Sequence, residues 1–247
     1  MDKSLIYPVG TTRACGYAAE KLRSAGFSLA DHPSPEVTHL LLDVPAFGNG
    51  RGENVPEILQ MLPRQVIAAG GNLCGNLPEG CLGWDFLQDE DYLAQNAAIT
   101  AQCTLRVAAP VLSGTLQDAP ALVIGWGRIG KCLGKLLKAL GNDVTVAARK
   151  EKDRAMLRAL GYRTENISNL PAHLGRYRIV FNTAPEPILS ESDLSQTENC
   201  VKIDLASKKG LGGGDVIWAR GLPERYAPES SGELIARTMI RFLKEES

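Results

Sequence analysis

The sequence has no long apolar segment and no excess of charge of either sign. No apolar run approaches the roughly 18 residues that a membrane-spanning helix needs. The formal net charge is −1, from 27 basic and 28 acidic residues, so no overall field attracts nucleic acid or an anionic membrane. The first ten residues lack the apolar core of a signal peptide. We therefore expect a cytoplasmic protein that binds neither nucleic acid nor membranes.

Cysteine and histidine are also scarce, and their spacing argues against a metal site. The chain has 6 cysteines and 3 histidines, with no Cys-x-x-Cys pair and no histidine at metal-ligand spacing from a cysteine. We predict no metal and interpret the thiols as reduced and at least partly buried, which suits the cytosol. Core or surface roles are expected for His32, His39 and His173.

Strand and helix patterns alternate along the chain, which is typical of an α/β fold with parallel sheets. A helix over 92–112 separates two such groups of elements. The expected elements of the first group are strands at 4–9, 37–44 and 64–69 and a helix at 14–24. Those of the second are strands at 121–124, 143–148, 178–182, 200–206 and 216–219, helices at 129–140 and 153–160, and a closing amphipathic helix at 234–243.

The predicted fold is therefore a two-domain α/β protein. A smaller N-terminal α/β substrate domain covers 1–95, and a Rossmann-type doubly wound domain covers 96–228. Residues 229–247 form a C-terminal helix that packs back at the interdomain region, where we expect it to act with the 92–112 helix as a hinge.

The strongest motif is a glycine-rich turn, Gly-Trp-Gly-Arg-Ile-Gly, at 125–130. It follows a strand and opens an amphipathic helix, which is the context that the dinucleotide-binding fingerprint requires. Gly125 permits a tight turn, Gly127 lets a pyrophosphate approach the backbone, and Gly130 lets helix and strand pack closely. The helix N-terminus then offers free N–H groups to the phosphates. The plain alternative is a strand-to-helix turn without a ligand.

The end of the second strand indicates which dinucleotide binds. NAD-binding domains usually place Asp or Glu there to accept hydrogen bonds from the ribose. This strand ends Ala147-Ala148-Arg149-Lys150, and Arg149 and Lys150 could instead bind a 2′-phosphate. We therefore predict NADP, with NAD less favoured. Glu151 argues against this interpretation, and a solvated basic turn is the alternative.

Two further loops leave strand ends, where open α/β sheets bind ligands. They begin Asn182-Thr183 and Asp204-Leu205 and should follow the nicotinamide half of the cofactor, although Asn and Thr also form ordinary turns. The cofactor-binding candidates of the whole domain are Gly125, Trp126, Gly127, Arg128, Ile129, Gly130, Ala148, Arg149, Lys150, Asn182, Thr183, Ala184, Pro185 and Asp204.

With these residues in view, the chain resembles the family of dipicolinate synthase A subunits, which is related to the cofactor domain of D-2-hydroxyacid dehydrogenases. The motifs that carry the resemblance lie at 96–100, 125–130 with 148–149, 204–215, and 221–232. Over 1–91 mainly the turn at 10–13 is similar. The chain departs from the family at Ala101-Gln102-Cys103, where the family has x-Glu-Gly, and at Glu229, where it has Lys.

The resemblance implies an NADP-dependent oxidoreductase that converts dihydrodipicolinate to dipicolinate during sporulation. A flavoprotein-like B subunit would be its partner, and a homo-oligomer is compatible with the family. We expect Arg13, Thr11, Thr12 and Ser207 to bind the small dicarboxylate substrate, between the domains. Asn96, Thr100 and Glu229 are the catalytic candidates. Ordinary packing or capping is the alternative for each.

Two other functions remain open at this point. The basic loop is also similar to that of shikimate-dehydrogenase-like enzymes, so another NADP-dependent small-acid dehydrogenase is an alternative. A 2-hydroxyacid dehydrogenase is less well supported, because its catalytic histidine after a proline is replaced here by Pro228-Glu229. The second alternative is a catalytically silent NADP-binding subunit, which the substitutions at 101–103 and 229 would suit.

Overall fold

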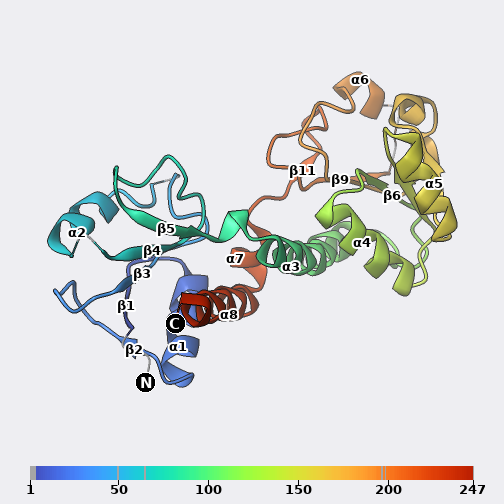
Figure 1. Ribbon diagram of the computed structural model, residues 1–247. Coiled ribbons are helices and arrows are strands. Elements are labelled where there is room, and N and C mark those ends of the chain that lie inside the picture. The colour runs from blue at the N-terminus through green and yellow to red at the C-terminus, as the bar shows by residue number, and fades with distance from the viewer. Residues whose placement is uncertain (1–3, 49, 64, 196, 198, 247) are drawn as a thin grey trace. The chain divides into compact units, whose positions relative to one another are not determined.

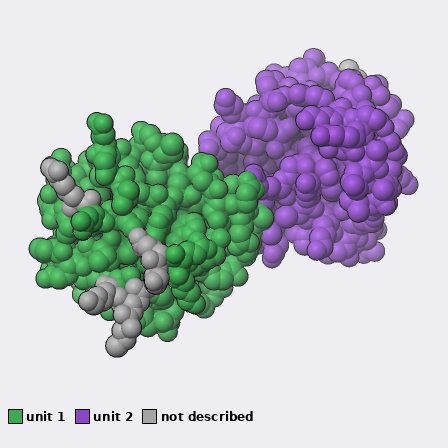
Figure 2. All heavy atoms as spheres, in the orientation of Figure 1, with its two compact units in different colours: residues 1–96, 223–247 green, residues 97–222 purple. Residues whose placement is uncertain are grey.

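The computed structural model describes residues 4–48, 50–63, 65–195, 197 and 199–246 (Figure 1). Its contacts divide the chain into two compact units, residues 1–96 with 223–247 and residues 97–222 (Figure 2). The mixed α/β class with parallel sheets, predicted from the alternation of patterns, is confirmed. The structure assigns the last helix to the first unit, whereas the sequence analysis ended the second domain at 228 and set 229–247 apart. The predicted hinge role stays a prediction.

The first unit is built on a parallel sheet with the strand order β2-β1-β3-β4-β5. Its elements are β1 (Leu5–Pro8), α1 (Arg13–Ser24), β2 (Ser28–Leu29), β3 (His39–Leu41), α2 (Val55–Met61), β4 (Ile67–Gly70), β5 (Leu82–Asp85), the 3-10 turn Phe86–Gln88 and α8 (Pro228–Glu246). Two elements cross the boundary between the units, α3 (Glu90–Ala108) and α7 (Leu222–Tyr226). The order of the sheet reverses between β1 and β3, which makes the carboxyl ends of those strands a topological switch point.

Helix α8 packs closely on α1 through small side chains. A Cβ atom added to Gly232 would lie 2.6 Å from the carbonyl oxygen of Ala14, so only glycine lets the two backbones come this close. Further along α8, the Phe242 ring contacts Trp84 and Phe86, with ring centroids 5.4 and 5.8 Å away. The C-terminal helix is therefore part of the first unit's core. It begins at Pro228, earlier than the apolar face at 234–243 predicted, because proline suits the first turn of a helix.

The second unit holds a parallel sheet with the order β11-β10-β9-β6-β7-β8. Its elements are β6 (Ala121–Ile124), α4 (Arg128–Ala139), β7 (Val144–Ala147), α5 (Glu151–Ala159), β8 (Arg163–Glu165), β9 (Ile179–Asn182), α6 (Glu191–Leu194), β10 (Val201–Asp204) and β11 (Ile217–Trp218), with 3-10 turns at Ile167–Ala172 and Leu174–Arg176. Counted along this unit, the order is 3-2-1-4-5-6, the doubly wound arrangement that binds dinucleotides. Its switch point lies between β6 and β9.

Most of the strands predicted from the sequence are buried; β1, which is largely half-buried, and the edge strand β11 are the exceptions. All four residues of β4, β6, β7 and β9 are buried, and such strands read as continuous apolar runs. Three strands were missed, namely β2, β5 and β8, and all three lie at sheet edges. These three strands are short and partly exposed, and none of them carries a long apolar run.

Candidate functional site

The glycine-rich turn joins β6 to α4 at the switch point of the second sheet, and each glycine meets a different physical demand. Gly125 has φ +98°, a left-handed conformation that side chains disfavour. A Cβ on Gly130 would lie 2.3 Å from the carbonyl oxygen of Gly125, so helix and turn touch there. A Cβ on Gly127 would meet nothing within 4 Å. At Gly127, therefore, neither conformation nor packing requires glycine, and the space above it is open to a ligand.

The N-terminus of α4 faces this open space without an internal cap. Gly127 is the N-cap residue and makes no side-chain cap hydrogen bond. The amides of a helix N-terminus and the helix dipole favour an anion there. The Trp126 side chain packs edge-on against Tyr162, with ring centroids 5.5 Å apart. Arg128 and Ile129 form the first turn of α4. The arrangement has the geometry of a pyrophosphate cradle.

Asn182 and Asp204 form a buried pair of hydrogen-bonded polar side chains beside this turn. Asn182 donates to Asp204 over 3.0 Å, and neither side chain is exposed. The Asp204 carboxylate also accepts hydrogen bonds from the amides of Ala206, Gly210 and Leu211. Asp204 and Asn182 therefore fix the loops around the switch point, a positioning role that their spacing in the sequence did not reveal. Thr183, in the first of these loops, donates to the carbonyl oxygen of Ile124 over 2.9 Å.

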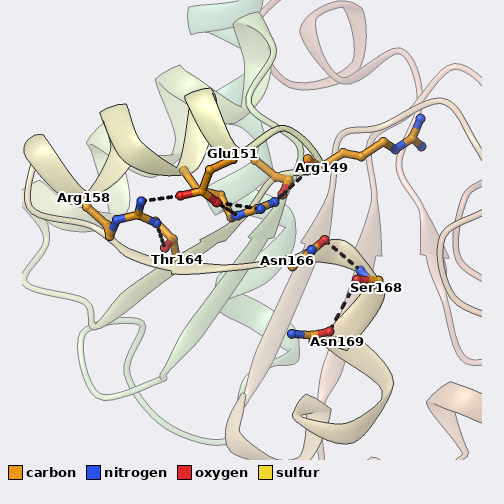
Figure 3. A network of polar contacts seen from close by, with 9 residues as sticks. Arg149, Glu151, Arg158, Thr164, Asn166, Ser168 and Asn169 are labelled. Atoms are coloured by element: carbon orange, nitrogen blue, oxygen red, sulfur yellow. Dashed lines mark hydrogen bonds and ion pairs between the residues drawn. The ribbon is translucent and has the colours of Figure 1, made fainter.

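The end of β7 presents the basic residues that sequence analysis singled out. Ala148 is buried, whereas Arg149 and Lys150 are exposed. Glu151, the residue that argued against NADP, lies in the first turn of α5 and pairs with Arg154 at 2.7 Å and Arg158 at 2.6 Å. Hydrogen bonds from these two arginines hold the pKa of the Glu151 carboxyl below its usual value. Figure 3 shows Arg149 extending away from this cluster.

The carboxylate of Glu151 is thus held along α5, and the group that projects from the strand end is a guanidinium. Arg154 also donates to the carbonyl oxygens of Ala148 and Arg149, over 2.7 Å each, and so fixes the backbone from which Arg149 extends. The side chain of Arg149 forms an ion pair with Glu186, in the loop after β9. Sequence analysis missed Glu186, because nothing in the spacing of the two residues indicates that they meet.

In the first unit, the predicted substrate turn at 10–13 is held by a residue that the sequence did not suggest. The Asp43 carboxylate, at the end of β3, accepts hydrogen bonds from the amides of Thr11 and Thr12 over 2.9 and 3.0 Å, and from both hydroxyls. Its side chain is buried. In the structure an internal carboxylate therefore occupies the amides and hydroxyls of both threonines, and their role in substrate binding stays a prediction.

A second internal carboxylate covers the N-terminus of α1. Glu224 accepts hydrogen bonds from the amides of Arg13 and Ala14, over 2.9 and 3.1 Å. The Arg13 side chain itself is exposed, and no carboxylate among the described residues pairs with it. Of the groups predicted in this turn, the guanidinium is thus the one left to bind a substrate anion. Its role stays a prediction.

The remaining candidates lie in varied surroundings. Thr100 is buried in α3 and accepts from Thr104 through its carbonyl oxygen, while Asn96 is half-buried one turn earlier. Ser207 is exposed just after β10, and Glu229 is exposed in the first turn of α8. Within the described residues no group of three or more metal-ligating side chains occurs. Catalysis by Asn96, Thr100 or Glu229 stays a prediction.

Cys74 is exposed, so the expectation that the thiols are at least partly buried is wrong for this residue, while Cys15, Cys103 and Cys200 are buried. Burial raises the pKa of the Cys15 thiol to about 12, with the Asp43 carboxylate adding to the shift, and burial raises the pKa of Cys200 to about 11. Neither is a ready nucleophile. His39 is buried in β3 beside Trp84, and His173 bonds to Glu165 over 3.0 Å. Over the part of the chain that the structure describes, no helix has the length and apolarity to cross a membrane.

Comparison with known proteins finds similarity to the A subunit of dipicolinate synthase, both in sequence and in fold. No family model matches the chain. The A subunit of dipicolinate synthase from Bacillus subtilis (strain 168) is 28% identical over 165 residues, which cover 63% of this chain and 56% of that protein. The matched part thus spans little more than half of the relative.

Solved structures extend the likeness to the whole fold. A crystal structure of the Bacillus subtilis dipicolinate synthase A chain has a TM-score of 0.80 at 20% identity and covers 100% of this chain and 99% of that one. The transhydrogenase of Sinorhizobium meliloti has a TM-score of 0.75 at 14% identity, covering 98% and 94%. The resemblance to the A subunit of dipicolinate synthase that the motifs predicted is confirmed, and so is the fold.

Proposed function

We propose that this chain is an NADP-dependent oxidoreductase of the dipicolinate synthase A type, which oxidises dihydrodipicolinate to dipicolinate in the cytoplasm. The observation that carries the proposal is the end of β7. There the Arg149 guanidinium projects from the strand, and the neighbouring Glu151 carboxylate is held along α5 by two arginines. The similarity in sequence to the A subunit of dipicolinate synthase supports the choice of reaction.

The residues of the second unit fit a dinucleotide. The open space above Gly127 and the uncapped first turn of α4 would hold the pyrophosphate. Arg149, with Lys150 beside it, would hold the 2′-phosphate by charge-assisted hydrogen bonds. The loops after β9 and β10 are fixed by the hydrogen bond between Asn182 and Asp204 and would line the nicotinamide half of the cofactor. When bound, the nicotinamide supplies the acceptor for the substrate's hydride.

The chain's own task is then to bind and orient a dicarboxylate. Arg13 offers an exposed guanidinium that can pair with one carboxylate of the substrate. Ser207, exposed at the end of β10, offers a hydroxyl. Little acid–base assistance is required, because formation of the aromatic ring favours loss of the ring proton. The replacement of a histidine by Glu229 at the start of α8 is therefore compatible with this reaction.

The cofactor half of the proposal is tested by titrating NADP+ and NAD+ calorimetrically. We expect tighter binding of NADP+, and Arg149→Ala should remove most of that preference, on the order of 1–3 kcal/mol for a charge-assisted contact. Arg163→Ala is the matched control, because Arg163 is also exposed and ion-paired, with Asp143, at the start of β8. Equal or stronger binding of NAD+ by the wild type would contradict the proposal.

The substrate half is tested by following turnover of dihydrodipicolinate with NADP+, with and without a candidate flavoprotein-like B subunit. We expect Arg13→Ala to raise KM strongly and to leave NADP+ binding nearly unchanged. Unchanged turnover by this variant would show that Arg13 lies outside the substrate site.

A silent NADP-binding subunit is the second candidate function, and a specific observation favours it. The amides at the predicted substrate turn are occupied by Asp43 and Glu224, so that turn has fewer free donors for a dicarboxylate than expected. Binding of NADP+ with no turnover, even with the B subunit present, would support this candidate over the enzyme.

A further inference from the structure

The ion pair between Arg149 and Glu186 crosses the carboxyl end of the second sheet. In that sheet β6 lies between β7 and β9, and it hydrogen-bonds to both. Arg149 follows β7 and Glu186 follows β9, so their ion pair joins the loops on either side of the glycine-rich turn that follows β6. A dinucleotide held by that turn has its adenosine ribose at the end of β7. The pair therefore occupies the guanidinium that a 2′-phosphate requires.

We propose that Glu186 is a specificity-determining residue, which competes with the 2′-phosphate of NADP for Arg149. The proposal rests on the function proposed above and adds a residue that weakens the preference for NADP. In the free protein, the Glu186 carboxylate neutralises the guanidinium. A cofactor with a 2′-phosphate must displace that carboxylate, whereas NAD leaves the ion pair in place.

The backbone is fixed at both ends of the pair, so the exchange involves the side chains alone. At one end Arg154 binds the carbonyl oxygens of Ala148 and Arg149. At the other end, hydrogen bonds hold the loop on either side of Glu186. The side-chain amide of Asn182 donates to the carbonyl oxygen of Ala184 over 3.0 Å. The backbone amide of Ile188 donates to the carbonyl oxygen of Gly210 over 2.8 Å. Both charged side chains are more than half exposed, 65% for Arg149 and 56% for Glu186. Such a pair can open without any change of the loops.

The other carboxylate near the strand end does not compete for Arg149. Glu151 is held by Arg154 and Arg158, and Figure 3 shows the Arg149 side chain directed away from it. Within the described part of the chain, Glu186 is the acidic residue with which Arg149 pairs. Removal of the Glu186 charge should therefore free Arg149 completely, and no second carboxylate would replace it.

The charges determine whether removal of the Glu186 carboxylate strengthens or weakens NADP+ binding. A phosphate monoester carries about 1.5–2 negative charges near pH 7 and three acceptor oxygens, so it outcompetes a single carboxylate for a guanidinium. Once displaced, Glu186 remains near the phosphate and repels it. Exposed ion pairs contribute up to about 1 kcal/mol, which corresponds to a change in affinity of about 2–5-fold. This is the size of gain expected for NADP+ when the Glu186 charge is removed.

The test is a calorimetric titration of NADP+ and NAD+ into the full chain and four variants: Glu186→Gln, Arg149→Ala, the double variant and Glu191→Gln. Glu191 is an exposed acid of the same unit, in the first turn of α6, so its variant controls for the change in net charge. We expect Glu186→Gln to tighten NADP+ binding about 2–5-fold and to leave NAD+ within a factor of about 1.5. In the Arg149→Ala background, Glu186→Gln should leave the NADP+ affinity unchanged, because the guanidinium with which Glu186 pairs is absent.

The outcomes separate this inference from the function on which it rests. Unchanged or weaker NADP+ binding by Glu186→Gln, an equal gain from Glu191→Gln, or a gain that persists without Arg149 would each overturn the role of Glu186 while the chain still binds the cofactor. Weaker NAD+ binding by Glu186→Gln would show that Glu186 contacts the ribose instead, which also overturns it. If the wild type binds neither nucleotide, the proposed function fails, and the inference fails with it.

Discussion

The two units have similar parallel sheets, but the loop at the switch point is open in the second unit and filled by side chains in the first. In the second unit, the turn after β6 leaves the first turn of α4 without a side-chain cap and leaves open space above Gly127. In the first unit, the turn after β1 is filled, because Thr12 caps α1, Asp43 binds two amides and Glu224 binds two more. Strand order thus creates a switch point in each sheet, and local side chains decide whether the donors there are free for a ligand.

The largest effect expected from this comparison concerns Asp43. Asp43→Ala would leave two amides and two hydroxyls of the turn at 10–12 without their acceptor, at a loss of about 3 kcal/mol in the free energy of unfolding. Hydrogen exchange followed by mass spectrometry would report the loss in the first unit's peptides, with those of 97–222 unaffected. Asp43→Asn keeps one acceptor oxygen and should lose less. Equal protection of wild type and Asp43→Ala would show that the turn does not depend on this carboxylate.

A pair of glycine variants tests the other side of the comparison. Gly130→Ala places a Cβ 2.3 Å from a carbonyl oxygen, so the backbone must shift, which should lower stability by about 1–3 kcal/mol and weaken NADP+ binding as well. Gly127→Ala enters open space with an ordinary φ of −80°, so the melting temperature should be unchanged. If a pyrophosphate binds there, its affinity should still fall on the order of tenfold. Unchanged NADP+ binding by Gly127→Ala would place the phosphates elsewhere.

The smallest effect concerns acid stability in the first unit, where Asp89 forms an ion pair with Arg241. Burial opposes ionisation of Asp89, but the hydrogen bonds from Arg241 and from the amide of Tyr92 outweigh it and hold the Asp89 pKa below its usual 3.8. A carboxyl whose pKa is lowered on folding stabilises the protein above its unfolded pKa, and this contribution is lost as the pH falls through the folded value.

Asp89→Asn should therefore destabilise the chain by about 0.5–1 kcal/mol at pH 7, because Arg241 is partly exposed and its charge is screened. The difference between variant and wild type should shrink as the pH is lowered below 3.8, the usual pKa of the group. Urea unfolding at pH 7 and at the lower pH measures it, with the exposed residue Asp31 changed to Asn as the control. A difference that is the same at both values would mean that the Asp89 charge does not take part.

The glycine-rich turn of the second unit could be predicted from the sequence, whereas the contacts that hold the turn of the first unit could not, for a physical reason. The glycine-rich turn is local, so its glycines, its strand and its helix lie next to one another in the chain, and Arg149 follows one strand later. The groups that hold the turn of the first unit come from far away. Asp43 lies 32 residues from Thr11, and Glu224 lies 211 residues from Arg13. No periodicity or spacing indicates such contacts.

The sequence by itself determined the α/β class, the buried strands and the glycine-rich turn, because each depends on the order of residues within one short segment. Only the tertiary structure decided which charges meet. It joined Arg149 to Glu186 across β6, turned Glu151 towards Arg154 and Arg158, and placed Asp43 and Glu224 on the N-terminus of α1. Hydrogen bonds and ion pairs act over a few ångströms in space whatever the separation along the chain, so the folded arrangement alone determines which groups are left for a ligand.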